Sequence, residues 1–433
     1  MGEPLRIGLA GLGTVGGGVG KQLELEADRL ATLAGRPIRV TAIAARDRAK
    51  DRGFDVSGMT WFDDATAMAA EADIDVFVEL IGGSDGPAKN AVEAALTAGR
   101  HVVTANKALI AHHGADLAAL AEEKKVALNY EAAVTGGIPV IKALREGLVA
   151  NRIESVAGIL NGTCNYILSE MERAEAAFED VLGEAQLLGY AEVDPTFDVG
   201  GTDAAHKLAI LAGLSFGKKV DFASVYVEGI EAISTVDIKF AKEFGYRIKL
   251  LGIAELNDKG EVIQRVHPAL IPLTSSLAAV QGVTNAVLIR GSYVGDAILE
   301  GEGAGEGPTA SAVVADLVDI ARGIVYAPFG LPSQALGEGR PADMGEHAGA
   351  YYLRLRAADR AGSMAEIAKA LGDAGVSIER IVQRSGDGIP GEWLPVVLIT
   401  HETQEATMRK AMELLDEHAD VVSEPVVIRI EEG

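Results

Sequence analysis

The segment 188–208, LGYAEVDPTFDVGGTDAAHKL, gathers side chains that could transfer protons. Its carboxylates are Glu192, Asp194, Asp198 and Asp203. Thr202 is a suitable helix N-cap, which would put Asp203 in the first turn and Lys207 four residues later on the same face. A lysine beside a carboxylate can donate a proton to a carbonyl oxygen, and the other carboxylates could bind an ammonium group. The residue types equally suit an acidic surface loop before a helix with one exposed ion pair.

Two further polar segments could complete such a site. Thr104–Lys107, TANK, follows a strand-like run, so Lys107 should lie at the carboxyl edge of a parallel sheet, where open α/β sheets bind ligands. Asn161–Leu168, NGTCNYIL, is a polar turn that enters a helix and could line a cleft.

The turn Gly11–Gly16, GLGTVG, joins a strand-like run to a helix with the spacing of a dinucleotide-binding loop. Its residues are Gly11, Leu12, Gly13, Thr14, Val15 and Gly16. The first glycine permits the tight turn, the second lets the backbone approach a pyrophosphate, and the third lets the helix pack on the strand. The free N–H groups at the start of the helix would face the phosphates. The context favours a nicotinamide dinucleotide site over a structural turn.

The end of the second strand bears on the choice of dinucleotide. An acidic residue at this position binds the ribose hydroxyls of NAD, whereas Arg46, with Lys50 nearby, suits the 2′-phosphate of NADP. Asp47 could still take the hydroxyls if Arg46 turns away. The pattern favours NADP(H) without excluding NAD(H), and a purely solvated role for the two cations stays open.

These candidate sites need elements to position them, and residues 1–133 alternate β-rich runs with alanine-rich helical stretches. The expected strands are Arg6–Ala10, Arg39–Ala44, Val76–Leu80, His101–Thr104 and Ala127–Tyr130. The expected helices include Asp64–Ala72 and Ala88–Ala98. The alternation predicts an α/β fold, with a Rossmann-type, doubly wound parallel sheet. A helix at Thr309–Gly323, in the segment 309–330, is expected to return and complete this domain.

In residues 134–308, helix-like segments come first and strand-like segments follow, which predicts a central α+β domain. Its expected helices are Ile138–Leu148, Glu175–Leu188 and Asp203–Leu214, and its expected strands are Tyr246–Ala254, Val262–Pro268 and Ala286–Tyr293. Residues 336–349 are polar and glycine-rich and indicate a linker. Residues 350–433 predict a ferredoxin-like βαββαβ domain. Its expected elements are Ala350–Ala357, Ser363–Ala374, Ile378–Arg384, Glu392–Thr400, Gln404–Glu417 and Val421–Ile430.

The composition narrows the class of partner. The formal net charge is −24, with 63 acidic and 39 basic residues, and such a surface repels nucleic acid and anionic membranes. The single cysteine, Cys164, allows no disulfide within the chain. Without a signal-like N-terminal segment or a long apolar stretch, we expect a cytoplasmic enzyme with a small-molecule substrate.

Taken together, the motifs resemble those of homoserine dehydrogenase. They are GLGTVG, TANK, EAAVTGGIP at 131–139, NGTCNYIL, LGYAEVDPTFDVGGTDAAHK and GAGEGPTASAVVADL at 303–317, in family order from the start to about Gly330. The resemblance implies reversible, NADPH- or NADH-dependent reduction of L-aspartate 4-semialdehyde to L-homoserine, in threonine, methionine and isoleucine biosynthesis. It also implies a central domain that binds substrate and forms a homodimer or a higher homo-oligomer.

The resemblance gives each matching residue a role. Lys207 would donate the proton to the aldehyde oxygen, and Lys107 would contact both substrate and cofactor near the nicotinamide. Glu192 and Asp203 would bind the substrate's ammonium group, with Asp203 also orienting Lys207. The other substrate-binding positions would be Asp198, Gly162, Thr163 and Tyr190.

In the family, the loop that matches 131–138 binds a monovalent cation, sodium or potassium. The ligands would be the Glu131 carboxylate and the carbonyl oxygens of Val134, Gly136 and Ile138. Hard cations take oxygen ligands, although the residues alone favour a tight turn before a helix.

Residues 350–433 resemble an ACT domain, through DRAGS at 359–363 and VSIERI at 376–381. Such domains often bind an amino-acid effector, which implies feedback inhibition, with L-threonine the first candidate. A dimerisation module that has lost its effector is equally compatible. Because no kinase-like segment precedes Gly11, we expect the monofunctional form.

Other functions would require other residues. A dinucleotide-binding sensor needs no proton donor, so Lys207 separates it from an enzyme. A thioester-forming aldehyde dehydrogenase needs a cysteine with a base, and Cys164 has no evident one. His112 and His113 are adjacent and point apart on a helix, so we expect no zinc site. The side chain of His206 projects about 100° from that of Lys207, which indicates a structural role.

Overall fold

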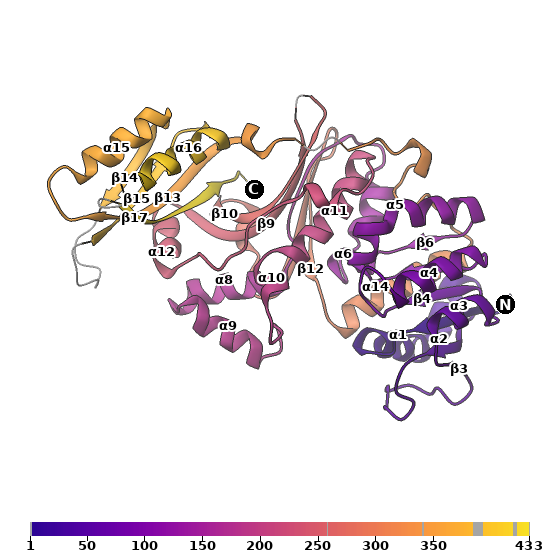
Figure 1. The fold of residues 1–433 in the computed structure, drawn as a ribbon. Helices are drawn as coiled ribbons and strands as arrows, with labels where there is room; N and C mark the ends of the chain where they lie inside the picture. The colour runs from indigo at the N-terminus through magenta and orange to yellow at the C-terminus, as the bar shows by residue number, and fades with distance from the viewer. Residues whose placement is uncertain (1, 258, 340–341, 384–392, 419–421, 433) are drawn as a thin grey trace.

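The computed structural model describes residues 2–257, 259–339, 342–383, 393–418 and 422–432. Figure 1 shows three regions in a row, with the N-terminal Rossmann domain at one end and the βαββαβ domain at the other. The predicted combination of a Rossmann domain, a central domain and a C-terminal ACT-like domain is confirmed.

The N-terminal domain holds a six-stranded parallel sheet in the order β3-β2-β1-β4-β5-β6. The strands are β1 Leu5–Ala10, β2 Ile38–Ala44, β3 Thr60–Phe62, β4 Val76–Glu79, β5 His101–Thr104 and β6 Leu128–Asn129. The helices are α1 Thr14–Leu25, α2 Ala27–Ala34, α3 Ala65–Glu71, α4 Pro87–Thr97 and α5 Lys107–Lys124. The strand order reverses between β1 and β4, which creates the crevice where doubly wound sheets bind ligands.

The helix α14, Glu306–Ala321, comes from far along the chain and packs beside α1 (Figure 1). Its residues Val313 and Leu317 are fully buried in the same core as Ile7 and Val78 of the sheet. The predicted return of this helix to the first domain is therefore confirmed.

The central domain is an antiparallel sheet, in the order β12-β11-β7-β9-β10, with helices on one face. Its strands are β7 Ile153–Ile159, β8 Tyr226–Val227, β9 Tyr246–Leu256, β10 Val262–Pro272, β11 Thr284–Gly291 and β12 Gly295–Glu302. Its helices are α6 Ala132–Thr135, α7 Val140–Lys142, α8 Gly162–Ala174, α9 Phe178–Leu187, α10 Thr196–Val199, α11 Thr202–Phe216, α12 Thr235–Glu243 and α13 Ser276–Ala279. The α+β prediction is confirmed, but β7, β8 and β12 were not predicted.

The helix expected at Ile138–Leu148 is instead one α turn, α7, followed by a π-helical turn at Ala143–Gly147. Pro139 explains the late start, because a proline disfavours helical backbone at the residue before it. The π turn shifts the register of the second half of the segment.

The C-terminal domain has the predicted order, with strands arranged β17-β13-β15-β14. Its elements are β13 Ala348–Ala358, α15 Ser363–Ala374, β14 Ile378–Gln383, β15 Trp393–Thr400, α16 Glu405–Asp416 and β17 Val422–Ile430, with the short strand β16 Thr403–Gln404 beside β13. The expected element ends at Arg384, Glu392 and Val421 lie outside the described residues.

Two features join this domain closely to the central one. Strand β17 pairs in parallel with β10, so that both domains share one eleven-stranded sheet. The expected linker at 336–349 is also packed in its described part, since Leu336 is buried and Gly337 pairs with Lys218. Its last turn, Met344–Glu346, leads directly into β13.

Candidate functional site

A cavity of about 690 Å³ lies where the first domain meets the central domain. It collects most of the predicted catalytic and substrate-binding residues, namely Lys107, Gly162, Thr163, Tyr190, Asp198, Asp203 and Lys207. These residues come from the starts of α5, α8 and α11, from the short helix α10 and from the loop before it, so segments far apart in sequence meet here.

Asp203 is the centre of the site. Its carboxylate lies 2.7 Å from Nζ of Lys207, one helical turn later, and 3.0 Å from Nζ of Lys107 at the start of α5. Lys207 Nζ also donates a hydrogen bond to the carbonyl oxygen of Leu160 at 2.7 Å. The predicted pairing of Asp203 with Lys207 on one helix face is confirmed.

The N-cap prediction for α11 is wrong in its detail. Gly201 is the N-cap, with φ of +85°, and Thr202 is the first helical residue. A side chain at position 201 would meet Val227 and Val266 at 3.0 to 3.2 Å, and the left-handed backbone favours glycine. Asp203 still occupies the first turn, where the helix dipole stabilises its negative charge.

Burial and neighbouring charges set the protonation of this cluster. Burial lowers the pKa of Lys207, and Lys107 lowers it further against the opposing effect of Asp203. Burial alone would raise the pKa of Asp203, but the charges of Lys207 and Lys107 hold it below its usual value. Asp198 behaves differently, because burial is the main cause that raises its pKa. The cluster therefore offers a lysine that loses its proton more readily than usual.

Sequence reasoning missed the role of Asn161. Its side-chain Nδ2 donates to Asp198 at 2.8 Å and to Asp203 at 2.9 Å, and its Oδ1 caps α8 by accepting from the N–H of Cys164. An asparagine directly before a helix is a common N-cap, so the cap itself had a sequence signal. The bridge between two carboxylates had none, because it depends on the tertiary fold.

The start of α8 forms one wall of the cavity. The hydroxyl of Thr163 donates to the carbonyl oxygen of Tyr190 at 2.6 Å, and the ring of Tyr190 lies 5.0 Å from that of Tyr166. A side chain at Gly162 would come within 2.6 Å of the carbonyl oxygen of Val283. These contacts hold the 188–191 loop against the first turn of α8.

Glu192 is the one predicted substrate ligand that the cavity does not include. It is exposed, on the loop between α9 and α10, and its carbonyl oxygen accepts a hydrogen bond from Gln186. Its neighbour Asp194, also exposed, accepts hydrogen bonds from Thr196. The acidic loop thus divides into an inner part, with Asp198 and Asp203, and an outer part that faces solvent.

A second cavity, of about 680 Å³, lies over the glycine-rich turn. Gly11 has φ of +91°, and a side chain there would lie 2.3 Å from the carbonyl oxygen of Leu80. Gly16 packs as closely against Gly11, while Gly13 is exposed with open space above it. No side chain caps the start of α1 at Thr14, so its first N–H groups are available. The turn therefore fits a dinucleotide pyrophosphate, and Val15 extends it into the first cavity.

The far end of this second cavity carries the candidate ribose-binding residues. Arg46, Asp47 and Lys50 line it and are exposed, and Arg46 has no ion-pair partner among the residues that the structure describes. Arg52, which sequence reasoning missed, is buried below them. Its guanidinium donates to the carbonyl oxygens of Asp47 and Lys50 and lies over the ring of Trp61. Arg52 thereby holds the loop that presents Arg46.

Comparisons with known proteins agree with this architecture. The family model for the homoserine dehydrogenase NAD-binding domain matches residues 11–131, the homoserine dehydrogenase model matches 139–318, and the ACT domain model matches 351–420. The chain belongs to the homoserine dehydrogenase family. It is therefore an oxidoreductase that binds a nicotinamide dinucleotide and carries a C-terminal ACT domain.

Individual members of the family match over their whole length. A homoserine dehydrogenase of Neisseria gonorrhoeae is 45% identical over 441 residues, and one of Pseudomonas aeruginosa is 47% identical over 440, each covering 99% of both chains. The crystal structure of a homoserine dehydrogenase from Thiobacillus denitrificans matches with a TM-score of 0.93 at 45% identity, covering 100% of this chain and 99% of that one.

The expected cation loop lies beside the cavity, and two of its expected ligands, Val134 and Gly136, line it. The buried Glu131 carboxylate accepts hydrogen bonds from the backbone N–H groups of Ile141 at 2.8 Å and Lys142 at 2.9 Å. Each oxygen keeps a further lone pair for a cation. The Ile138 carbonyl oxygen, by contrast, already accepts from Thr135 Oγ1 and from the N–H of Val140.

Burial raises the pKa of Glu131 to about 7, and the charge of buried Asp316 adds to this shift. A carboxylate in this state gains most from a nearby cation. The chemistry of Glu131 thus suits a cation ligand, whereas the Ile138 carbonyl oxygen could become one only by giving up a hydrogen bond.

The surroundings of Cys164 and of the histidines do not suit a catalytic role. Cys164 is buried, burial raises its pKa well above the usual value, and its thiol donates to the carbonyl oxygen of Asp198 at 3.2 Å. A thiol in this state is a poor nucleophile. His206 stacks on Phe222 and lies 3.3 Å from His112, between nitrogen atoms. Among the described residues, no group of three or more His, Cys, Asp or Glu side chains could hold a metal ion.

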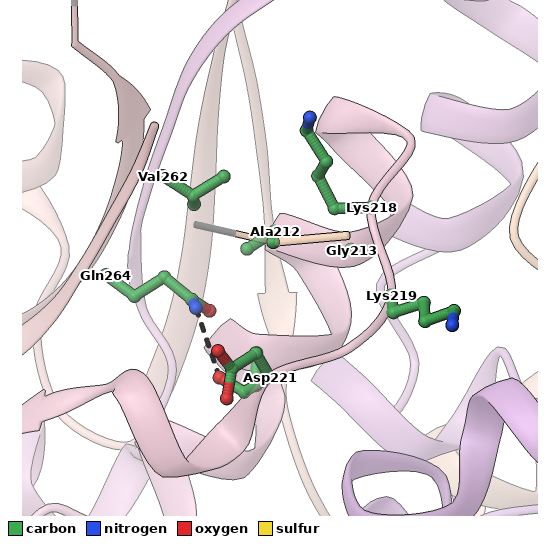
Figure 2. Close-up of a pocket in the computed structure, with 9 residues that line it drawn as sticks. Ala212, Gly213, Lys218, Lys219, Asp221, Val262 and Gln264 are labelled. Atoms are coloured by element: carbon green, nitrogen blue, oxygen red, sulfur yellow. Dashed lines mark hydrogen bonds between the residues drawn. The ribbon is translucent and has the colours of Figure 1, made fainter. Parts of the chain in front are cut away.

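A further hollow lies behind the C-terminal end of α11, with Gln264 hydrogen-bonded to the carbonyl oxygen of Asp221 (Figure 2). Lys218 and Lys219 extend away from it in this view. Its volume of about 10 Å³ is close to that of a single water site, so it cannot take a substrate. In the described part of the chain, no helix is long and apolar enough to cross a membrane.

Proposed function

We propose that this chain reversibly reduces L-aspartate 4-semialdehyde to L-homoserine, with NADPH preferred over NADH, as a step toward threonine, methionine and isoleucine. The observation that carries the site assignment is the buried Lys207, held between Asp203 and a backbone carbonyl at the cavity wall. A dinucleotide-binding sensor would have no use for such a proton donor.

The bound nicotinamide supplies or accepts the hydride. The chain's own contribution is to hold the substrate and to move the proton. Lys207 gives its proton to the aldehyde oxygen during reduction, and its lowered pKa makes the proton easier to transfer. Asp203 orients Lys207, and Lys107 lies on the other side of the same carboxylate, at the edge of the dinucleotide domain.

The substrate is an amino acid, and the cavity has groups for both of its charged ends. Asp198 and Asp203 suit the ammonium group, and Glu192 joins them if its loop folds over the bound substrate. The first N–H groups of α8, at Gly162 and Thr163, suit the carboxylate, because the first turn of a helix leaves them without backbone partners. Tyr190 completes the wall.

The NADPH preference rests on Arg46 and Lys50 at the end of the second cavity. The structure of a hyperthermophilic archaeal homoserine dehydrogenase in complex with NADPH matches with a TM-score of 0.63 at 26% identity, covering 74% of this chain and 98% of that one. The pyrophosphate would lie on the turn Gly11–Gly16, with the nicotinamide toward Lys107. A sodium or potassium ion would be held by Glu131, Val134 and Gly136, with Ile138 as a fourth ligand after it exchanges a hydrogen bond.

We also propose the unit boundaries 1–133 with 309–330, 134–308 and 350–433, with the central unit forming a homodimer or a higher homo-oligomer. The ACT domain would take an amino-acid effector, L-threonine first, near the 359–363 loop. Gly362 there has φ of +103° and is followed directly by the first turn of α15.

The first test is an assay of the purified protein with L-aspartate 4-semialdehyde and NADPH, then NADH, with and without L-threonine. We expect rapid loss of the reduced cofactor's absorbance, faster with NADPH, and inhibition by L-threonine. No oxidation of either cofactor, in protein that binds dinucleotide, would overturn the proposed reaction. Equal rates with the two cofactors would overturn only the preference.

A further inference from the structure

We infer that Arg429, in the ACT domain, is a positioning residue for the substrate site. Its side chain is 3% exposed and contacts both domains. Within its own domain, Nε and Nη2 donate to Glu405 at 2.9 and 2.7 Å. Across the interface, Nη1 donates to Glu228 at 2.8 Å, and Nη2 donates to the hydroxyl of Tyr226 at 3.1 Å. Both cross-domain partners lie in the segment 226–230.

The segment 226–230 is anchored on β10 and passes directly behind the catalytic turn, which we define as residues 198–201. The N–H of Glu228 donates to Val266 of β10 at 2.8 Å, and the N–H of Ile230 donates to the carbonyl oxygen of Val199 at 2.9 Å. No side chain separates the two backbones, because a Cβ at Gly229 would lie only 2.5 Å from that same oxygen. A shift of Glu228 must therefore be passed on to the turn.

The catalytic turn in turn sets the positions of two carboxylates. Asp198 is its first residue, and Asp203 follows its last residue by two positions. Both accept hydrogen bonds from Asn161, so their separation is defined by one amide group. Displacements well below 1 Å at such a site alter substrate binding measurably, because alignment of the reacting groups is steeply distance-dependent.

Opposite charges strengthen the contact between Arg429 and Glu228. Burial would raise the pKa of Glu228, but the hydrogen bonds and the charge of Arg429 hold it below its usual value. The side chains that face the Arg429 guanidinium are Glu228, Glu405 and Tyr226. Charge-assisted hydrogen bonds of this kind are the strong class, and two carboxylates share one cation across the domain boundary. Arg429 thereby adds a charged side-chain link between the ACT domain and the catalytic turn to the backbone link through β10.

Two matched variants test the inference. Glu228→Gln weakens the cross-domain half of the Arg429 contacts, whereas Glu405→Gln weakens the half within the ACT domain. Both remove one carboxylate from the same guanidinium, and Glu405→Gln should lower the unfolding temperature more, because Glu405 is buried and also accepts a hydrogen bond from Tyr351. We expect Glu228→Gln to raise the KM for L-homoserine about three- to tenfold without changing the KM for NADP, and Glu405→Gln to change neither.

Arg429→Lys keeps the charge but loses the paired geometry, so its KM should lie between those of the wild type and Glu228→Gln. An unchanged KM for L-homoserine in Glu228→Gln, or an equal rise in both glutamine variants, would overturn the inference. The inference rests on the proposed site, but the two fail separately. Full activity of a Lys207→Met variant would overturn the proposed site, while the comparison of Glu228→Gln with Glu405→Gln would still measure the effect of Arg429.

Discussion

The two cavities hold their charges in opposite ways. In the substrate half, Asp203 and Lys207 are buried, and each makes several hydrogen bonds or ion pairs. In the dinucleotide half, Arg46 and Lys50 are exposed to solvent at the end of a long cavity. The volumes of the two cavities are nearly equal, about 690 and 680 Å³, so the difference lies in organisation rather than in size.

This difference indicates that the substrate cavity controls the chemical step and that the dinucleotide cavity controls the choice of cofactor. Buried, bonded charges are preorganised, so a change to one of them should alter the rate of the chemical step. Exposed charges contribute little to binding individually, because water screens them and their side chains must be ordered. Substitutions in the substrate half should therefore have large effects on kcat, and those at the ribose end should have small effects on one cofactor's KM.

The largest effect is expected from Lys207→Met. Methionine fills a similar volume but cannot donate a proton, so kcat in both directions should fall about 10²- to 10⁴-fold. Binding of NADP, measured by calorimetry, should stay within about twofold of the wild type, because Lys207 lies outside the second cavity. A kcat within tenfold of the wild type would assign the proton to another group and would remove the contrast between the cavities.

Asn161 allows the two roles of one side chain to be separated. Asn161→Ser keeps an N-cap for α8 but loses the amide that joins Asp198 to Asp203. We expect kcat/KM for L-homoserine to fall about ten- to a hundredfold, and stability to fall by about 1 to 3 kcal/mol because the two carboxylates lose a hydrogen-bond donor. Asn161→Ala, which also loses the cap, should lower kcat/KM similarly and lower stability by about 1 kcal/mol more. A kcat/KM in Asn161→Ser equal to that of the wild type, with a loss only in Asn161→Ala, would mean that the side chain acts only as a cap.

Glu131 should make stability depend on pH. Its pKa in the folded chain is raised to about 7, so the folded state binds more protons than the unfolded state above about pH 4.5. The stabilisation is present at low pH and is lost as the pH rises through about 7, by up to about 1.4 kcal/mol per pH unit. Glu131→Gln should remove this slope in the unfolding temperature measured from pH 5 to 7.5.

The same measurement tests the proposed cation. Sodium or potassium should flatten the slope of the wild type relative to tetramethylammonium, because the cation stabilises the carboxylate. It should leave Glu131→Gln unchanged. Identical slopes in all three salts would contradict a cation bound at Glu131.

Lys107→Gln should move a pH profile rather than abolish activity. The charge of Lys107 helps burial to lower the pKa of Lys207, so its removal should raise that pKa toward the usual lysine value. Oxidation of L-homoserine requires neutral Lys207, so the alkaline rise of its kcat/KM should shift to higher pH. A rise at the wild-type pH would show that the profile reports a different group.

The smallest effect is expected at the ribose end. Arg46→Ala should raise the KM for NADPH about fivefold and leave the KM for NADH unchanged. Arg48→Ala is the matched control, because Arg48 is equally exposed on the same loop but is paired with Asp63 at 2.9 Å. A similar change for both cofactors in Arg46→Ala would contradict recognition of a 2′-phosphate.

Local patterns in the sequence predicted most of the fold. The strand at His101–Thr104 and the helix at Ser363–Ala374 have the predicted bounds, because each combines a clear hydrophobic period with glycine or polar residues at its ends. The pairing of β17 with β10 had no local signal, since it joins residues more than 150 positions apart and only two residues of each strand take part.

In the candidate site, too, contacts between near neighbours in sequence were predicted and contacts between distant segments were missed. The i, i+4 spacing of Asp203 and Lys207 was enough to predict their contact, because helix geometry alone determines it. The bridge made by Asn161 was missed because the carboxylates that it joins come from other elements. Arg52 was missed because its contacts depend on the path of an irregular loop and on the ring of Trp61. The substrate roles of Glu192 and the other matching positions came from the family resemblance and stay predictions.

The pairing of β17 with β10 also concerns the order in which the protein is made. On the ribosome, the central sheet is complete in sequence long before β17 emerges, so one edge of β10 must wait for the last residues of the chain. An unpaired strand edge is a template for aggregation. A stop codon before Arg429 would leave that edge open, even though every candidate catalytic residue had been translated.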